Sequence, residues 1–128
     1  MLKKNNILIR KIIENCKKYP NKIIISDKKK SLTYTQLLSL AIKNSKKIKN
    51  LKSDYIPILI DRNVESVIAI LAVVFSKKIF CPISNSFPDE RINLFLNILK
   101  TKKLINCSNK KLNFVKEFRI NLNLNNKS

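Results

Sequence analysis

Cysteine, carboxylate and lysine side chains are the groups in this chain that could do chemistry, because the sequence contains no histidine. The three cysteines are Cys16, Cys81 and Cys107. Their number is odd and no two of them form a C-x-x-C pair, the spacing typical of zinc ligands and redox dithiols. The sequence therefore predicts buried free thiols, no metal site, and a reducing cytoplasm as the compartment.

General acid–base chemistry would have to use the eight acidic residues. Asp89 and Glu90 are adjacent, but adjacent residues of a helix point in different directions. We interpret Arg91 with Glu90 as a surface pair on that helix. Without histidine, no Ser-His-Asp or Cys-His arrangement exists. We therefore assign no catalytic, cofactor-binding or metal-binding residue.

The net charge of +19 would favour nucleic acid or an anionic membrane as a partner. Bidentate recognition of phosphate and guanine prefers arginine, but only four of the 27 basic residues are arginines: Arg10, Arg62, Arg91 and Arg119. The lysines are dispersed in short groups, as at residues 28–30. Two interpretations stay open. The lysines form a solvated surface with nonspecific, salt-sensitive polyanion binding, or the chain is a small basic protein that binds nucleic acid or another polyanion.

Alternating helix and strand patterns run along the chain. We expect helices over residues 6–18, 34–48, 64–76 and 88–100, and strands over residues 22–26, 55–60, 79–83 and 104–106. Strands that alternate with helices of this length favour right-handed βαβ units and a parallel sheet. The most apolar stretch, residues 64–75, is shorter than the roughly twenty residues that a membrane-spanning helix needs. We therefore expect no membrane span.

Several residues mark the ends of these elements. Thr33 and Gln36 form a capping box for the second helix, with Leu32 and Leu37 as its hydrophobic staple. Two further positions mark helix starts and one marks a strand start. Asn63 is expected to cap the third helix, Pro88 to lie in the first turn of the fourth, and Pro57 to lie near the start of its strand.

Three short segments are similar to a known family in both order and spacing. Residues 32–37 read LTYTQL, residues 76–84 read SKKIFCPIS, and residues 87–92 read FPDERI. They resemble the L-T-Y-x-E-L, A-G-x-x-Y-x-P-[LIV]-D and Y-P-x-E-R-[IL] motifs near the start of adenylate-forming (AMP-dependent) synthetases and ligases. The last segment indicates the amino-acid-activating branch, which contains nonribosomal peptide synthetase adenylation domains and D-alanine carrier-protein ligases. The resemblance covers residues 8–107 and only the N-terminal part of the family's length.

Two departures from these motifs affect the local backbone. Lys77 stands where the family has a glycine that ends the preceding helix in a left-handed conformation, and a residue other than glycine costs about 1 kcal/mol there. Ser84 stands where an acid is usual. Both departures make the expected turn geometry less favourable than in the family.

The resemblance implies activation of a carboxylate by ATP to an acyl-AMP, followed by transfer to a thiol. That chemistry needs a glycine-rich phosphate loop, carboxylates for magnesium and ribose, and a late catalytic lysine. A chain without glycine cannot form a phosphate loop of the usual kind. ATP and magnesium are therefore implied only for the full-length family, and we transfer no site residue.

We expect an α/β fold of three layers, with a partial, mostly parallel sheet flanked by helices. Residues 1–107 would be the truncated N-terminal part of an adenylation domain, and residues 108–128 an Asn/Lys-rich, poorly ordered tail in which only residues 112–120 are a structured candidate. The chain would be inactive alone, as a split-enzyme half or a truncated remnant. Its partner would be the separately encoded remainder of the enzyme or a carrier protein. A structural module that pairs with another adenylation protein is a third interpretation.

Overall fold

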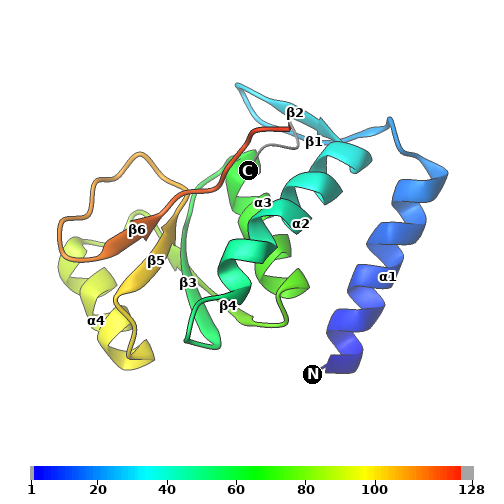
Figure 1. The fold of residues 1–128 in the computed structure, drawn as a ribbon. Helices are drawn as coiled ribbons and strands as arrows, with labels where there is room; N and C mark the ends of the chain where they lie inside the picture. Colours follow the sequence, from blue (N-terminus) through cyan, green and yellow to red (C-terminus); the bar gives the residue numbers. More distant parts are fainter. Residues whose placement is uncertain (1, 125–128) are drawn as a thin grey trace.

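The computed structural model describes residues 2–124, with side chains from Ile7 onward (Figure 1). Its elements, in chain order, are α1 (Leu2–Lys18), β1 (Ile23–Ser26), β2 (Ser31–Thr33), α2 (Tyr34–Lys49), β3 (Tyr55–Ile60), α3 (Val64–Phe75), β4 (Ile79–Ser84), α4 (Asp89–Leu99), β5 (Lys103–Asn106) and β6 (Lys116–Phe118). No helix in this described part is long and apolar enough to cross a membrane.

The main sheet has four strands in the order β4-β3-β5-β6, and all of its strand pairs are parallel. Figure 1 shows α4 on one face of this sheet and α2 and α3 on the other, with α1 outermost beyond α2 and α3. The expected three-layered α/β fold with a parallel sheet is therefore confirmed.

The core consists of buried clusters on both faces of the sheet. Ile56 and Ile58 of β3 and Ile105 of β5 pack against α2 and α3. Leu59 of β3 and Leu104 of β5 pack against α4. Successive side chains of a strand point to opposite faces, so a strand covered by helices on both sides must be apolar along its whole length. This requirement explains the continuous apolar run of β3.

Pro57 is the third residue of β3, which lies between β4 and β5. The pairing with β4 extends along the whole strand, whereas the pairing with β5 begins only at Ile58. Proline has no amide hydrogen to donate to a ladder. Its expected position near the start of the strand is confirmed, because it precedes the segment that is paired on both sides.

The helix starts agree with the sequence in two cases and differ in one. The amide of Gln36 donates to Thr33 Oγ1 at 3.2 Å, and the amide of Thr33 donates to Gln36 Oε1 at 3.0 Å, which confirms the capping box. The Ser66 amide donates to Asn63 Oδ1 at 3.0 Å, so that cap is also confirmed. Pro88 was expected in the first turn of α4, but its ψ of 158° is extended and makes it the N-cap residue.

The strands β1 and β2 form an antiparallel hairpin that is separate from the main sheet. The sequence predicts β1 but not β2, whose three residues are too few to show an alternating pattern. The hairpin turn is closed by Asp27, whose Oδ1 accepts from the amides of Lys29 at 2.7 Å and Lys30 at 2.8 Å. A short polar turn therefore adds a strand that periodicity alone misses.

The chain beyond residue 107 contacts the rest of the fold at three places. Leu112 is buried against the α4 side of the sheet, and β6 extends the sheet beside β5 within the structured candidate 112–120. Farther on, the amide of Asn121 donates to Asn44 Oδ1 of α2 at 2.9 Å, and Asn44 Nδ2 donates to the Asn121 carbonyl at 3.0 Å. Leu112, β6 and Asn121 thus contact the main sheet and α2, while residues 125–128 of the expected tail lie outside the described part. The amino-acid composition of this segment does not predict its contact with α2, because asparagine side chains and backbone groups make that contact through hydrogen bonds.

Candidate functional site

The residues of the three sequence motifs build packing clusters, and only the second and third motifs meet, through Ile83 and Ile92 on the α4 side of the sheet. Leu32 and Leu37 pack against α3, whereas Phe87 packs on the α4 side of the sheet. The Phe87 ring stacks on Phe95 with centroids 5.8 Å apart, and the Arg91 guanidinium lies 4.4 Å from the Phe87 centroid. Phe87 is thus the partner of Arg91, and no ion pair joins Arg91 to its neighbour Glu90 in the described part of the chain.

A cleft of about 1040 Å³ lies where β3 and β5 end, and we call it the carboxyl-edge cleft. Open parallel sheets commonly bind ligands beyond the carboxyl ends of their strands. Its walls are the β1–β2 turn, the start of α3, the loop after β5 and the segment after β6. Polar side chains that line it include Asp27, Asp61, Arg62, Asn63, Glu65, Asn106 and Arg119.

Asp27 occupies the position in this cleft that would suit an anionic ligand. Helix N-termini attract phosphates and carboxylates because their amides are unpaired. At the N-terminus of α3, the amide of Val64 donates to Asp27 Oδ2 at 2.9 Å. This bond, together with those from the amides of Lys29 and Lys30, holds the pKa of Asp27 below its ordinary value of 3.8. A carboxylate of the chain itself therefore takes the place of a ligand at this helix end.

The opposite wall of the cleft is a closed hydrogen-bond network around Asn106. Its Nδ2 donates to Glu117 Oε1 at 2.9 Å, and its Oδ1 accepts from the Ser108 amide at 2.9 Å. Arg119 Nη1 donates to the carbonyl oxygens of Asn106 at 3.0 Å and Ser108 at 2.6 Å. Burial raises the pKa of Glu117, but the bonds from Asn106 and the Leu112 amide outweigh it, so the pKa is lowered overall. These polar groups are engaged with one another and hold the loop after β5 in place.

ATP and magnesium do not fit the residues present. A phosphate loop requires glycine, of which the sequence has none, and Asp27 fills the N-terminus of α3. Within residues 2–124, no three His, Cys, Asp or Glu side chains are grouped so as to hold a metal ion.

The three cysteines are free thiols in the described part of the chain. Cys107 is buried as expected, and burial raises its pKa to about 12. Cys16 and Cys81 are only half-buried, which corrects the expectation for these two. Burial also raises the pKa of Cys81, and Cys16 Sγ lies 3.8 Å from Thr35 Oγ1.

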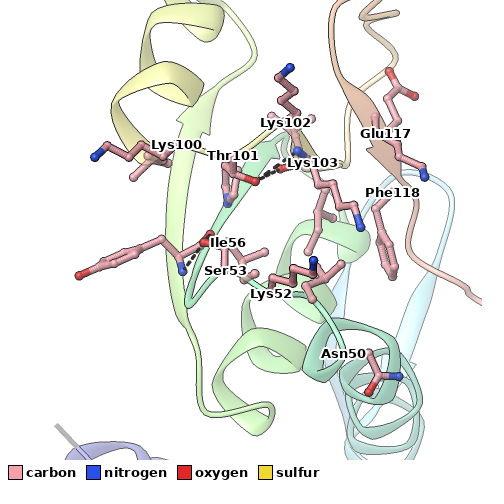
Figure 2. Close-up of a pocket in the computed structure, with 17 residues that line it drawn as sticks. Asn50, Lys52, Ser53, Ile56, Lys100, Thr101, Lys102, Lys103, Glu117 and Phe118 are labelled. Atoms are coloured by element: carbon pink, nitrogen blue, oxygen red, sulfur yellow. Dashed lines mark hydrogen bonds between the residues drawn. The ribbon is translucent and has the colours of Figure 1, made fainter.

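A second cavity of about 670 Å³ lies at the opposite end of the sheet, where β3, β5 and β6 begin. We call it the amino-edge pocket, and Figure 2 shows its lining residues. Its walls come from residues 50–53 and 55–57, 99–105, and 116–118. The sequence analysis missed this pocket because the three segments are far apart along the chain. The one available signal is the lysines at or shortly before the strand starts, namely Lys52, Lys102, Lys103 and Lys116.

No protein-family model matches the chain, and no curated protein matches its sequence. Solved structures of nonribosomal peptide synthetases, however, share its fold. The structure of FmoA3 with bound alpha-methyl-L-serine-AMP is 14% identical with a TM-score of 0.75, over 85% of this chain and 13% of that one. Klebsiella oxytoca NpsA in complex with 3-hydroxyanthranilyl-AMSN is 18% identical with a TM-score of 0.69, over 84% of this chain and 23% of that one.

The N-terminal subdomain of NpsA, solved separately with the same ligand, locates this similarity within the larger protein. It is 18% identical with a TM-score of 0.70, over 84% of this chain and 29% of the subdomain chain. At such identities the likeness concerns the fold. The chain has the fold of part of an adenylation domain and spans less than a third of the length of these neighbours, which confirms the expected fold resemblance.

Proposed function

We propose that this chain is the N-terminal structural segment of an amino-acid-activating, adenylate-forming ligase and has no ATP-dependent activity by itself. The observation that carries the proposal is the likeness to the NpsA N-terminal subdomain over 84% of the chain. The three sequence motifs support it independently, because they lie in the order and spacing of the family's opening motifs. In this chain they serve as a helix cap, an edge strand and a helix start.

Inactivity of the segment alone follows from the residues that it lacks. Formation of an acyl-AMP needs backbone amides that wrap around phosphate, and the glycine-free sequence has no loop able to do so. The one well-placed helix N-terminus in the carboxyl-edge cleft already binds Asp27. A further polypeptide segment, either continuous with this chain or separately encoded, must supply the phosphate loop, the magnesium ligands and the catalytic lysine.

A carrier protein is the second expected partner. An artificial fusion of the adenylation protein NpsA with the carrier ThdA has a TM-score of 0.70 to this chain. By analogy, the complete ligase would pass its activated acid to a carrier thiol. The three free cysteines fit a reducing cytoplasm as the compartment.

The test begins with the DNA. Translation of the region that follows the codon for Ser128 in all frames should reveal a glycine-rich phosphate loop and a later lysine motif. The encoded polypeptide is then co-expressed with this chain, and amino-acid-dependent ATP–pyrophosphate exchange is measured on the purified pair. We expect exchange from the pair and none from either part alone.

Two results would overturn the proposal. Amino-acid-dependent exchange by this chain alone would contradict its inactivity. A soluble, co-purifying pair that shows no exchange with any of the standard amino acids or with aromatic acids would contradict its place in an amino-acid-activating ligase.

A further inference from the structure

The amino-edge pocket combines an apolar floor with a positively charged rim. The apolar residues that line the floor with accessible surface are Leu51, Tyr55, Leu99 and Phe118, from the strand starts and the loops beside them. Leu51, Leu99 and Phe118 are half-buried, so packing holds one side of each while the other side faces the pocket. A preformed apolar hollow of this size suits the body of a small organic molecule.

The rim is electropositive. Five lysines line the pocket, namely Lys52, Lys100, Lys102, Lys103 and Lys116, with Glu117 as the single carboxylate. Glu117 accepts a hydrogen bond from Asn106 Nδ2, and its Oε2 lies 3.4 Å from Arg119 Nη2. Arg119 therefore offsets most of the negative charge that Glu117 would otherwise present to the lysines. None of the five lysines forms an ion pair with a carboxylate in residues 2–124.

Two of these lysines converge on the pocket. Figure 2 shows the ends of Lys52 and Lys103 turned toward the same space beside the Phe118 ring, whereas Lys100 and Lys102 project away from it. Lys52 lies in the loop before β3 and Lys103 begins β5, so separate elements position the two ammonium groups. An anionic group held between them would place an attached apolar body against Phe118 and the floor.

We propose that the amino-edge pocket binds an amphipathic organic anion, that is, a small molecule with a carboxylate or similar group on an apolar chain or ring. Lys52 and Lys103 bind the anionic group, and the floor around Phe118 and Leu51 buries the apolar body. The net charge of +19 attracts every anion, but only an amphipathic one gains from the floor as well. This site is independent of the adenylation chemistry proposed above.

The test titrates the ¹⁵N-labelled full chain with octanoate, acetate and octyl glucoside, and follows the amide signals by NMR. Octanoate should bind saturably and shift signals of residues 52–57, 101–105 and 116–118. Acetate carries the same charge without the alkyl chain and should bind at least about tenfold more weakly, since each buried methylene group contributes substantially to the binding free energy. Octyl glucoside carries the alkyl chain without the charge and should also bind more weakly than octanoate.

Matched variants separate the pocket from the general charge. The double variant Lys52→Gln/Lys103→Gln should weaken octanoate binding by about fivefold, as expected for the loss of two exposed ion pairs. The control Lys17→Gln/Lys18→Gln removes the same charge from α1, away from the pocket, and should leave the affinity unchanged. All four lysines are exposed, so neither variant threatens folding.

Three outcomes would overturn the proposal. Equal weakening in both double variants would show a bulk charge effect. Equal affinity for acetate and octanoate would show that the floor is not used. Octanoate shifts spread over the lysine-rich surface would show that the pocket is not the binding site.

Discussion

At the scale of single residues, Asp27 connects parts of the fold that are distant in sequence. One carboxylate oxygen closes the β1–β2 turn and the other accepts the first amide of α3, 37 residues later. These bonds favour the ionised form and lower the pKa of Asp27 below 3.8. The stabilisation is therefore fully present above the unfolded-state pKa and is lost as the pH falls through the folded-state pKa.

We predict that the Asp27→Asn substitution makes the free energy of unfolding less dependent on pH in the acidic range. The free energy of unfolding of the unaltered chain should fall more steeply than that of the variant as the pH drops from about 5 to about 3. Urea unfolding at a series of pH values measures both slopes. Glu14→Gln on the exposed surface of α1 is the control and should keep the slope of the unaltered chain. Identical slopes for Asp27→Asn and the unaltered chain would contradict the role of Asp27.

At the scale of elements, lysine performs the role that glycine usually has at two helix ends. Lys77 after α3 and Lys100 after α4 have φ values of 62° and 55°. After α3, the amide of Lys77 donates to the Val74 carbonyl at 3.0 Å and that of Lys78 to the Val73 carbonyl at 3.1 Å. These paired bonds form a Schellman motif, which normally has glycine at the left-handed position. The left-handed conformation expected at Lys77 is confirmed, whereas that of Lys100 emerges only from the structure.

We predict that Lys77→Gly stabilises the chain by about 1 kcal/mol, because glycine removes the left-handed penalty at this position. Lys77 is exposed, so the substitution removes no buried contact. Lys46→Gly is the matched control within α2 and should destabilise the chain by about 1 kcal/mol, since glycine is unfavourable inside a helix. Urea unfolding of both variants provides the comparison. A loss of stability in Lys77→Gly would refute the strain argument.

At the scale of the whole molecule, high positive charge is combined with exposed apolar surface. The main sheet ends at β4 on one side and β6 on the other. Leu94 and Ile98 on the outer surface of α4 are 58% and 66% exposed, and Phe80 on the edge strand β4 is 38% exposed. An uncovered sheet edge with apolar neighbours invites association with other chains. This surface is consistent with a segment that another polypeptide completes.

We predict that duplex DNA binds weakly and without sequence preference. The lysines are dispersed and arginines are few, so binding should rest on counterion release and fall steeply with salt, disappearing by about 150 mM. Fluorescence anisotropy with two unrelated duplexes over a salt series measures both properties. Saturable, sequence-selective binding at about 150 mM would instead support the small basic nucleic-acid-binding protein as the function.

Much of the fold follows from short-range features of the sequence. The capping box at Thr33 and Gln36, the cap at Asn63 and the left-handed Lys77 are all confirmed in the structure. Apolar periodicity also predicts the alternation of strands and helices, and with it the parallel sheet. These features are readable in advance because each depends on residues within a few positions of one another.

Only the tertiary structure decided where distant polar groups and lysines meet. The bond from Val64 to Asp27 and the pairing of Asn121 with Asn44 join residues from separate elements, and Lys52 and Lys103 line one pocket from separate segments. No local periodicity records such contacts, because they depend on how the layers pack. The sequence by itself determined the elements and their order, while the packing of those elements determined the clefts and which charges face them.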